Sequence, residues 1–209
     1  TDLEGNWAAD GNLPTTADWF MQSLCSAHLE QKYQWGEGIG FEDDIFLTNE
    51  EWMNYASGAD FVGIAPHAID LATGTEYALG VFTQGGYEKI IELNSQNPAI
   101  VVLAPSGYNG DFTNYDKELQ DRKDEYPHPE GREWVWPQNI CPSRLYIGVK
   151  GLDEQGNPAD DFLSRNGLRF GQIYGFAVPE ETPDRDPWHK TVANGAKVEG
   201  KFLPLDWRW

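Results

Sequence analysis

The sequence predicts an all-β protein built from antiparallel meanders, and two observations favour this class. From residue 45 onward, short apolar runs alternate with turns rich in Gly, Pro, Asn and Asp. Aromatic residues make up 13% of the chain, with nine Trp, which is typical of a folded protein rather than a disordered one. The 209 residues are enough for one domain over 1–209, with the short strands and long loops of a sandwich, barrel or propeller.

The first segments differ from this pattern. Residues 1–19 read as an irregular lead-in, and Asp18–Gln31 has an approximately helical apolar spacing with Asp18 as a candidate cap. In the stretch Gly40–Tyr55, GFEDDIFLTNEEWMNY, two groups of acids flank a short run with the composition of a β-strand, Ile45–Asn49. We expect a short helix followed by the first strand.

Seven further strands are expected. Phe61–Asp70 and Tyr77–Phe82 flank the tight-turn sequence Leu71–Gly74, which predicts a hairpin. A second antiparallel pair, and then three later strands, are expected at Tyr87–Leu93, Ala99–Leu103, Arg144–Lys150, Gln172–Val178 and Val198–Leu205.

Two long segments interrupt these strands. Pro105–Gln138 is rich in turn residues and aromatics, so we expect a functional loop, a lid or a partner-binding element, or else a short helix within it, near Asp116–Asp124. The segment Leu152–Arg169 is predicted to be an insertion in the meander.

The charge of the chain limits its partners. There are 34 acidic and 15 basic residues, and the net charge of −19 repels nucleic acid and anionic membranes. The chain has no apolar stretch long enough to span a membrane and no leader, and it starts at Thr1, so we expect a processed chain or a piece of a longer one. A secreted protein, extracellular or periplasmic, fits this composition.

The cysteines and histidines give weaker signals. Cys25 and Cys141 either form one disulfide or are two separate buried thiols. The four histidines are scattered and lack the spacing of a zinc site.

The acids around Ile45–Asn49 form a candidate cation site. Only Lys32 is basic between positions 1 and 88, so repulsion among these carboxylates needs compensation. Hard oxygen ligands of this kind favour Ca²⁺, and the alternative is a solvated acidic loop. The candidate ligands before and after the strand are Glu42, Asp43, Glu50 and Glu51.

The order of several short motifs resembles a known family. Between about Leu24 and Trp207 the chain contains, in this order, GFED, IFLTNEE, AIDLATG, GGYEK, SRLYIGVK, FLSRNGL and GQIYGFAV. In this order they resemble the β-propeller proteins related to PhoX-type calcium-dependent alkaline phosphatases. That family is a propeller of about six blades whose axial end carries calcium and, in active phosphatases, iron.

The resemblance implies a set of metal ligands and a function. It places Glu50, Glu51 and Glu88 at the axial end, with Glu42 and Asp43 nearby. Asn49 stands where the phosphatases carry a cysteine, so a thiolate for iron is missing. Ala104, Pro105 and Ser106 likewise stand where acids often follow a strand.

The resemblance leaves two functions open. One is a metal-dependent hydrolase of phosphomonoesters, with Arg165 as the candidate catalytic residue that holds the phosphate. Alternatively, Arg165 neutralises nearby acids such as Asp160 and Asp161. The other function is a non-catalytic structural or assembly module stabilised by calcium. Because a blade takes roughly 40–50 residues, the strands make only two to four blades, and another protein chain could complete the propeller.

Overall fold

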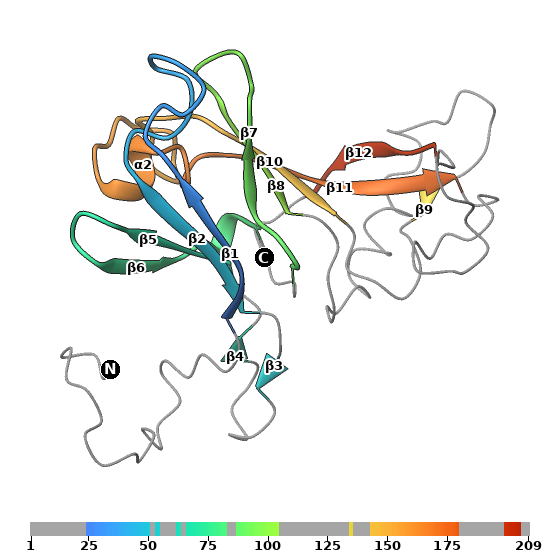
Figure 1. Ribbon diagram of the computed structural model, residues 1–209. Helices are drawn as coiled ribbons and strands as arrows, with labels where there is room; N and C mark the ends of the chain where they lie inside the picture. Colours follow the sequence, from blue (N-terminus) through green and yellow to red (C-terminus); the bar gives the residue numbers. More distant parts are fainter. Residues whose placement is uncertain are drawn as a thin grey trace, which may run out of the picture.

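The computed structural model describes residues 24–50, 53–54, 62–63, 66–82, 87–104, 134–135, 143–179 and 199–205. Within these ranges the chain forms two main antiparallel sheets, one short α-helix and one 3-10 turn (Figure 1). No helix in the described ranges is long and apolar enough to cross a membrane.

The first sheet has four strands in the order β1-β2-β5-β6. Its central strands are β2 (Ile45–Glu50) and β5 (Pro66–Asp70), and its edges are β1 (Leu24–Glu30) and β6 (Thr75–Ala78). The Asp70 carboxylate shapes the β5–β6 turn by accepting hydrogen bonds from Ala72 N and Thr73 Oγ1, at 2.9 and 2.8 Å. The predicted hairpin is confirmed, although Gly80–Phe82 forms a 3-10 turn, η1, beyond its second strand.

The prediction of a helix within Asp18–Gln31 is wrong for the part that the structure describes. Leu24–Glu30 is instead the edge strand β1, paired with β2 from Leu24↔Glu50 to Glu30↔Ile45. The pairing shifts between Cys25 and His28, where Ser26 has a positive φ of 63°. Apolar residues spaced as on a helix therefore belong to a bulged strand, because pairing with β2 outweighs a weak local pattern.

The second sheet has the strand order β12-β11-β10-β8-β7. Its strands are predicted by the sequence, with shifted ends: β7 (Ile91–Leu93), β8 (Ile100–Ala104), β10 (Arg144–Gly148), β11 (Gly171–Pro179) and β12 (Lys201–Pro204). Two short pieces are added, the pair β3 (Met53–Asn54) with β4 (Val62–Gly63), and β9 (Trp134–Val135) beside β11. In both main sheets the strand order follows the chain, so each sheet is a meander.

The two sheets share one hydrophobic core. In β8 and β10 alternate residues are buried on the inner face, as in Ile100, Val102 and Ala104 of β8. Rings also link the parts of the core: Phe82 of η1 lies 5.1 Å from Tyr146 of β10, and Tyr77 of β6 stacks on Phe162 at 4.9 Å.

The predicted insertion between β10 and β11 contains the helix α2 (Phe162–Arg165). Asp161 caps it by accepting hydrogen bonds from Leu163 N and Ser164 N, both at 3.2 Å. Figure 1 shows α2 at the end of the molecule where the loop between β1 and β2 also lies. This end brings together side chains far apart in the sequence.

The expected all-β, antiparallel class is therefore confirmed. The described residues form two main sheets, the short pair β3–β4 and no ring of blades, so the propeller stays a proposal. The helix predicted near Asp116–Asp124, nearly all of the long loop Pro105–Gln138, and Cys141 lie outside the described residues. The Cys25–Cys141 disulfide thus stays a prediction.

Candidate functional site

The loop 31–44 between β1 and β2 carries much of the candidate site. It folds back on itself through the hydrogen bond from Tyr33 N to Phe41 O, at 2.9 Å, and a bridge between Gly36 and Ile39. Phe41 is fully buried and anchors the returning arm in the core. The acids Glu42 and Asp43 are thereby held in front of β2.

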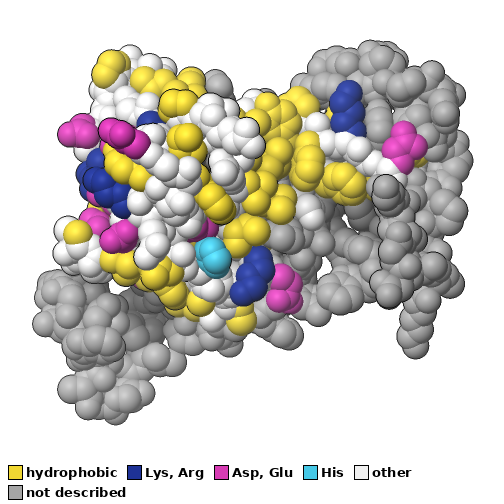
Figure 2. Space-filling model, turned by 45° about the horizontal axis from the view of Figure 1, so that its top comes forward, with side chains coloured by type: hydrophobic (Ala, Val, Ile, Leu, Met, Phe, Trp, Pro, Cys, Tyr) yellow, Lys and Arg dark blue, Asp and Glu magenta, His cyan; other side chains and the backbone are white. Residues whose placement is uncertain are grey.

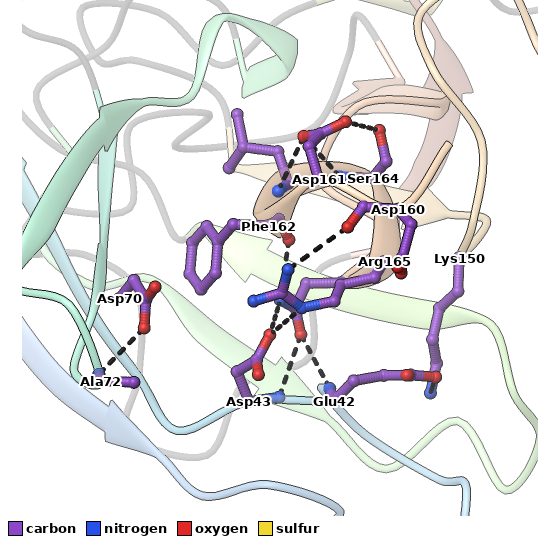
Figure 3. A network of polar contacts seen from close by, with 12 residues as sticks. Glu42, Asp43, Asp70, Ala72, Lys150, Asp160, Asp161, Phe162, Ser164 and Arg165 are labelled. Atoms are coloured by element: carbon purple, nitrogen blue, oxygen red, sulfur yellow. Dashed lines mark hydrogen bonds and ion pairs between the residues drawn. The ribbon is translucent and has the colours of Figure 1, made fainter. Parts of the chain in front are cut away.

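Asn166 and Arg165 bind this acidic arm from the α2 side. The buried Asn166 side chain accepts hydrogen bonds from Glu42 N and Asp43 N, at 2.7 and 3.2 Å, and donates to Asp43 Oδ2 at 2.7 Å. Arg165 Nε also donates to Asp43 Oδ2, at 2.6 Å (Figure 3). Burial acts to raise the pKa of Asp43, but the hydrogen bonds from Arg165 and Asn166 outweigh it and the pKa is lowered.

Lys150 is the second cation beside the arm. Its Nζ donates to the carbonyl oxygens of Gly38 and Gly40, at 3.1 and 2.8 Å, and lies 3.5 Å from Glu42 Oε1. Figure 2 shows acidic and basic side chains grouped at this end of the molecule. The ammonium group of Lys150 and the guanidinium group of Arg165 thus compensate charge at Glu42 and Asp43, and the calcium expected there stays a prediction.

Two buried glutamates lie next to this network, where the edge strands β1 and β7 meet. Gln34 Nε2 donates to Glu30 Oε2 and, at 2.8 Å, to Glu92 Oε2, so one amide nitrogen joins the two carboxylates. Glu30 Oε1 accepts a hydrogen bond from Glu92 N at 2.6 Å. Burial raises the pKa of Glu92 to about 7, because the loss of water disfavours the charged form.

The other end of β2 holds a different group of buried polar side chains. Asn49 is fully buried and Glu50 is 2% exposed. A strand of this length places Glu50 about 17 Å from Ile45, so Glu50 lies at the opposite end of the strand from Glu42 and Asp43. Glu88 lies before β7, and Glu51 is outside the described residues.

His67 on β5 is buried beside Thr48, its partner across the strands. Its Nδ1 lies 3.3 Å from Glu76 Oε1, yet neither ring nitrogen makes a hydrogen bond to a described residue. Burial lowers the pKa of His67 and raises that of Glu76, so both groups are biased toward their neutral forms.

The structure thus brings some predicted site residues together and separates others. Asp43 and Arg165 form an ion pair, and Glu42 shares the network through Asn166. Within the described ranges, no three acids, histidines or cysteines are grouped to hold a metal ion. The sequence interpretation missed Glu30, Gln34 and Glu92, since Glu30 and Glu92 meet across 62 positions with no local motif.

Comparisons with family models, with curated proteins and with solved structures found no match to this chain.

Proposed function

We propose that this chain is a calcium-stabilised, β-propeller-like assembly module of an extracellular protein related to PhoX-type phosphatases. The observation that carries the assembly role is the outer face of the second sheet, defined by Ile91, Leu93, Val101, Leu103, Leu145, Ile147, Gln172, Tyr174, Phe176, Phe202 and Pro204. These side chains are half-buried and, apart from Gln172, apolar. Figure 2 shows a band of hydrophobic side chains in the region of these strands.

The composition of this face is unusual for so acidic a chain. No acidic or basic residue lies on it among the described strand residues, although the chain has 34 acids. Loss of charge and gain of aromatic residues are typical of the centre of an interface. An uncharged, pleated face fits another sheet best, and the inner face of this sheet already packs on a sheet.

The partner is therefore a further antiparallel sheet from a neighbouring polypeptide, packed on the second sheet as the first sheet is. The order of strands supports this, since each sheet is a meander like a propeller blade. A second copy of this chain is a weaker candidate, because two chains of charge −19 repel each other.

The substitution Leu145→Lys tests the docking face. Because Leu145 faces outward, we expect the free energy of unfolding to change by less than about 1 kcal/mol, and the apolar dye ANS to bind less. The inner-face control Tyr146→Ala should cost roughly 3–5 kcal/mol. If Leu145→Lys destabilises the chain as much as the control, the chain covers this face itself and the proposal fails.

Sedimentation of the wild type tests whether a second copy of the chain occupies the docking face. If the occupant is a neighbouring polypeptide, we expect a monomer or weak, undefined association. If the wild type forms a stoichiometric dimer that Leu145→Lys dissociates, the partner on this face is a second copy of the chain and not a neighbouring polypeptide.

A second function, hydrolysis of a phosphomonoester, is favoured by one observation: Glu50 is an acid buried at the end of a central strand. Buried ionisable groups of this kind are concentrated at functional sites. The hard oxygen donors of Glu50 and Glu88, together with Glu51, which follows Glu50 in the sequence, suit calcium, which would bind and polarise a phosphate. Arg165 is already paired with Asp43 at the other end of β2, which favours its neutralising role.

Metal analysis of the purified protein and an assay on p-nitrophenyl phosphate, with and without calcium, test this second function. An enzyme predicts calcium-dependent turnover that Glu50→Gln abolishes, while Glu37→Gln, an exposed control, keeps it. Bound calcium without turnover would exclude the hydrolase and leave the assembly module as the proposed function.

A further inference from the structure

Two edge strands from different sheets meet at the buried glutamates. Glu30 ends β1 and Glu92 is the middle residue of β7. Both face the core, because Glu30 pairs with the buried Ile45 and Glu92 with the buried Val102. Ser26 Oγ adds a contact along the same seam by donating to Tyr87 O at 2.5 Å.

The hydrogen bonds at this seam depend on the carboxyl oxygens. Glu30 is fully buried and accepts from both Gln34 Nε2 and Glu92 N. Glu92 is 5% exposed and accepts from the same Gln34 amide. Glu92 also has a hydrogen bond from the Trp35 side chain. Each carboxylate thus has two donors and the two share one amide group, which is little for two buried carboxylates side by side.

The surrounding charges compensate this pair only in part. His28 Nε2 lies 3.4 Å from Glu30 Oε1, and the His28 side chain is partly exposed. Lys150 acts on Glu92 from the end of β10, but its ammonium group is bound to Gly38 and Gly40 and shared with Glu42. Tyr33 contacts that ammonium through its ring, 5.3 Å away.

The space around Glu92 is also closed. A Cβ atom on Gly40 would lie 3.3 Å from Glu92 Oε2, so the loop 31–44 packs directly over the carboxyl group. Water cannot easily replace the missing donors in such a space. A proton is the smallest group that relieves the repulsion, since a protonated carboxyl also becomes a donor.

We propose that Glu30, Gln34 and Glu92 form a proton-operated latch between the two sheets, closed when the Glu92 carboxyl group holds a proton and weakened when it is ionised. The latch joins β1, β7 and the loop 31–44, so its opening would loosen the arm that carries Glu42 and Asp43. The proposal is independent of the docking face and of any calcium site.

The sign of the pH effect follows from the raised pKa of Glu92, about 7 in the folded chain against 4.5 for the ordinary side chain. The folded state holds this proton more tightly than the unfolded state, so stability falls as pH rises from 4.5 to 7 and changes little above that. The population ratio of folded to unfolded chain should fall on the order of 100-fold across this window because of this group.

The test is the melting temperature and the hydrogen exchange of the Ile91–Leu93 amides of the full chain between pH 5 and 8.5. For the wild type we expect the β7 amides to lose protection as pH rises, after correction for intrinsic exchange. Glu92→Gln should melt higher than the wild type at pH 8 and lose most of this pH dependence. The exposed control Glu37→Gln should keep it.

Two further measurements keep the proposal open to refutation if Glu92→Gln does not fold. The carboxyl carbon of Glu92, followed by NMR in the wild type, should titrate near pH 7. Because the Gln34 hydrogen bond lowers the pKa of Glu92, Gln34→Leu should move this midpoint upward. Titration of Glu92 at an ordinary glutamate pKa, or β7 protection unaffected by pH, would overturn the latch.

Discussion

Asn166 is the residue that best shows how one side chain holds distant segments together. Its amide bonds Glu42 N, Asp43 N, Asp43 Oδ2 and Phe162 O, and it is fully buried. An aspartate could not donate here, and an alanine would leave two half-buried backbone N–H groups without this acceptor. FLSRNGL is thus a structural clamp on the acidic arm as well as a motif of the resemblance.

Asn166→Ala should therefore lower the free energy of unfolding by about 2–3 kcal/mol, since it orphans two backbone donors. Urea denaturation measures this change. The matched control is Asn157→Ala on the exposed turn of Asp153, where the loss should stay below about 1 kcal/mol. Equal effects in the two variants would show that the clamp has no special role.

The ion pair beside this clamp has a defined pH range. Because the pKa of Asp43 is lowered in the folded chain, the pair contributes stability above the ordinary aspartate pKa and loses it as pH falls through the lowered value. The Asp43 pair thus loses stability as pH falls, whereas Glu92 lowers stability as pH rises, so measurements across pH distinguish the two groups.

At the scale of elements, local chemistry explains which strands were predictable. The β5–β6 hairpin could be predicted because Asp70, Thr73 and Gly74 define its turn within a few residues. The edge strand β1 could not, because its partner β2 and the bulge at Ser26 determine it. Long-range pairing outweighs local spacing wherever an edge strand is short and bulged.

The β10–β11 pair shows a constraint that spacing alone does not reveal. Gly148 and Gly171 face each other in the register, and the Tyr146 ring lies against both. A Cβ on Gly148 would lie 2.0 Å from Gly167 O, and one on Gly171 would lie 2.6 Å from Tyr146 Oη. The glycines of YIGVK and GQIYG are therefore required by close packing.

At the scale of the whole molecule, the sequence predicted the class of fold better than the site. Alternating apolar runs predicted meanders, and the structure confirms two of them. The acids around β2 were expected to share one cation, but a strand length separates Glu50 from Asp43, which Arg165 and Asn166 bind. Charge compensation across more than 100 positions cannot be inferred from a count of nearby bases.

The charge of −19 leads to the last prediction, which concerns the stability of the entire chain in salt. Lys150, Arg165 and Arg169 are already paired with acids, so the excess of carboxylates repels itself and sodium chloride should raise the melting temperature by screening. If calcium binds near Glu50 as proposed, calcium chloride at equal ionic strength should raise it further by several degrees, by preferential binding to the folded state. Scanning calorimetry of the wild type and Glu50→Gln measures this difference, and Glu37→Gln is the control. Equal melting temperatures in the two salts would remove calcium from the proposal and leave the docking face unaffected.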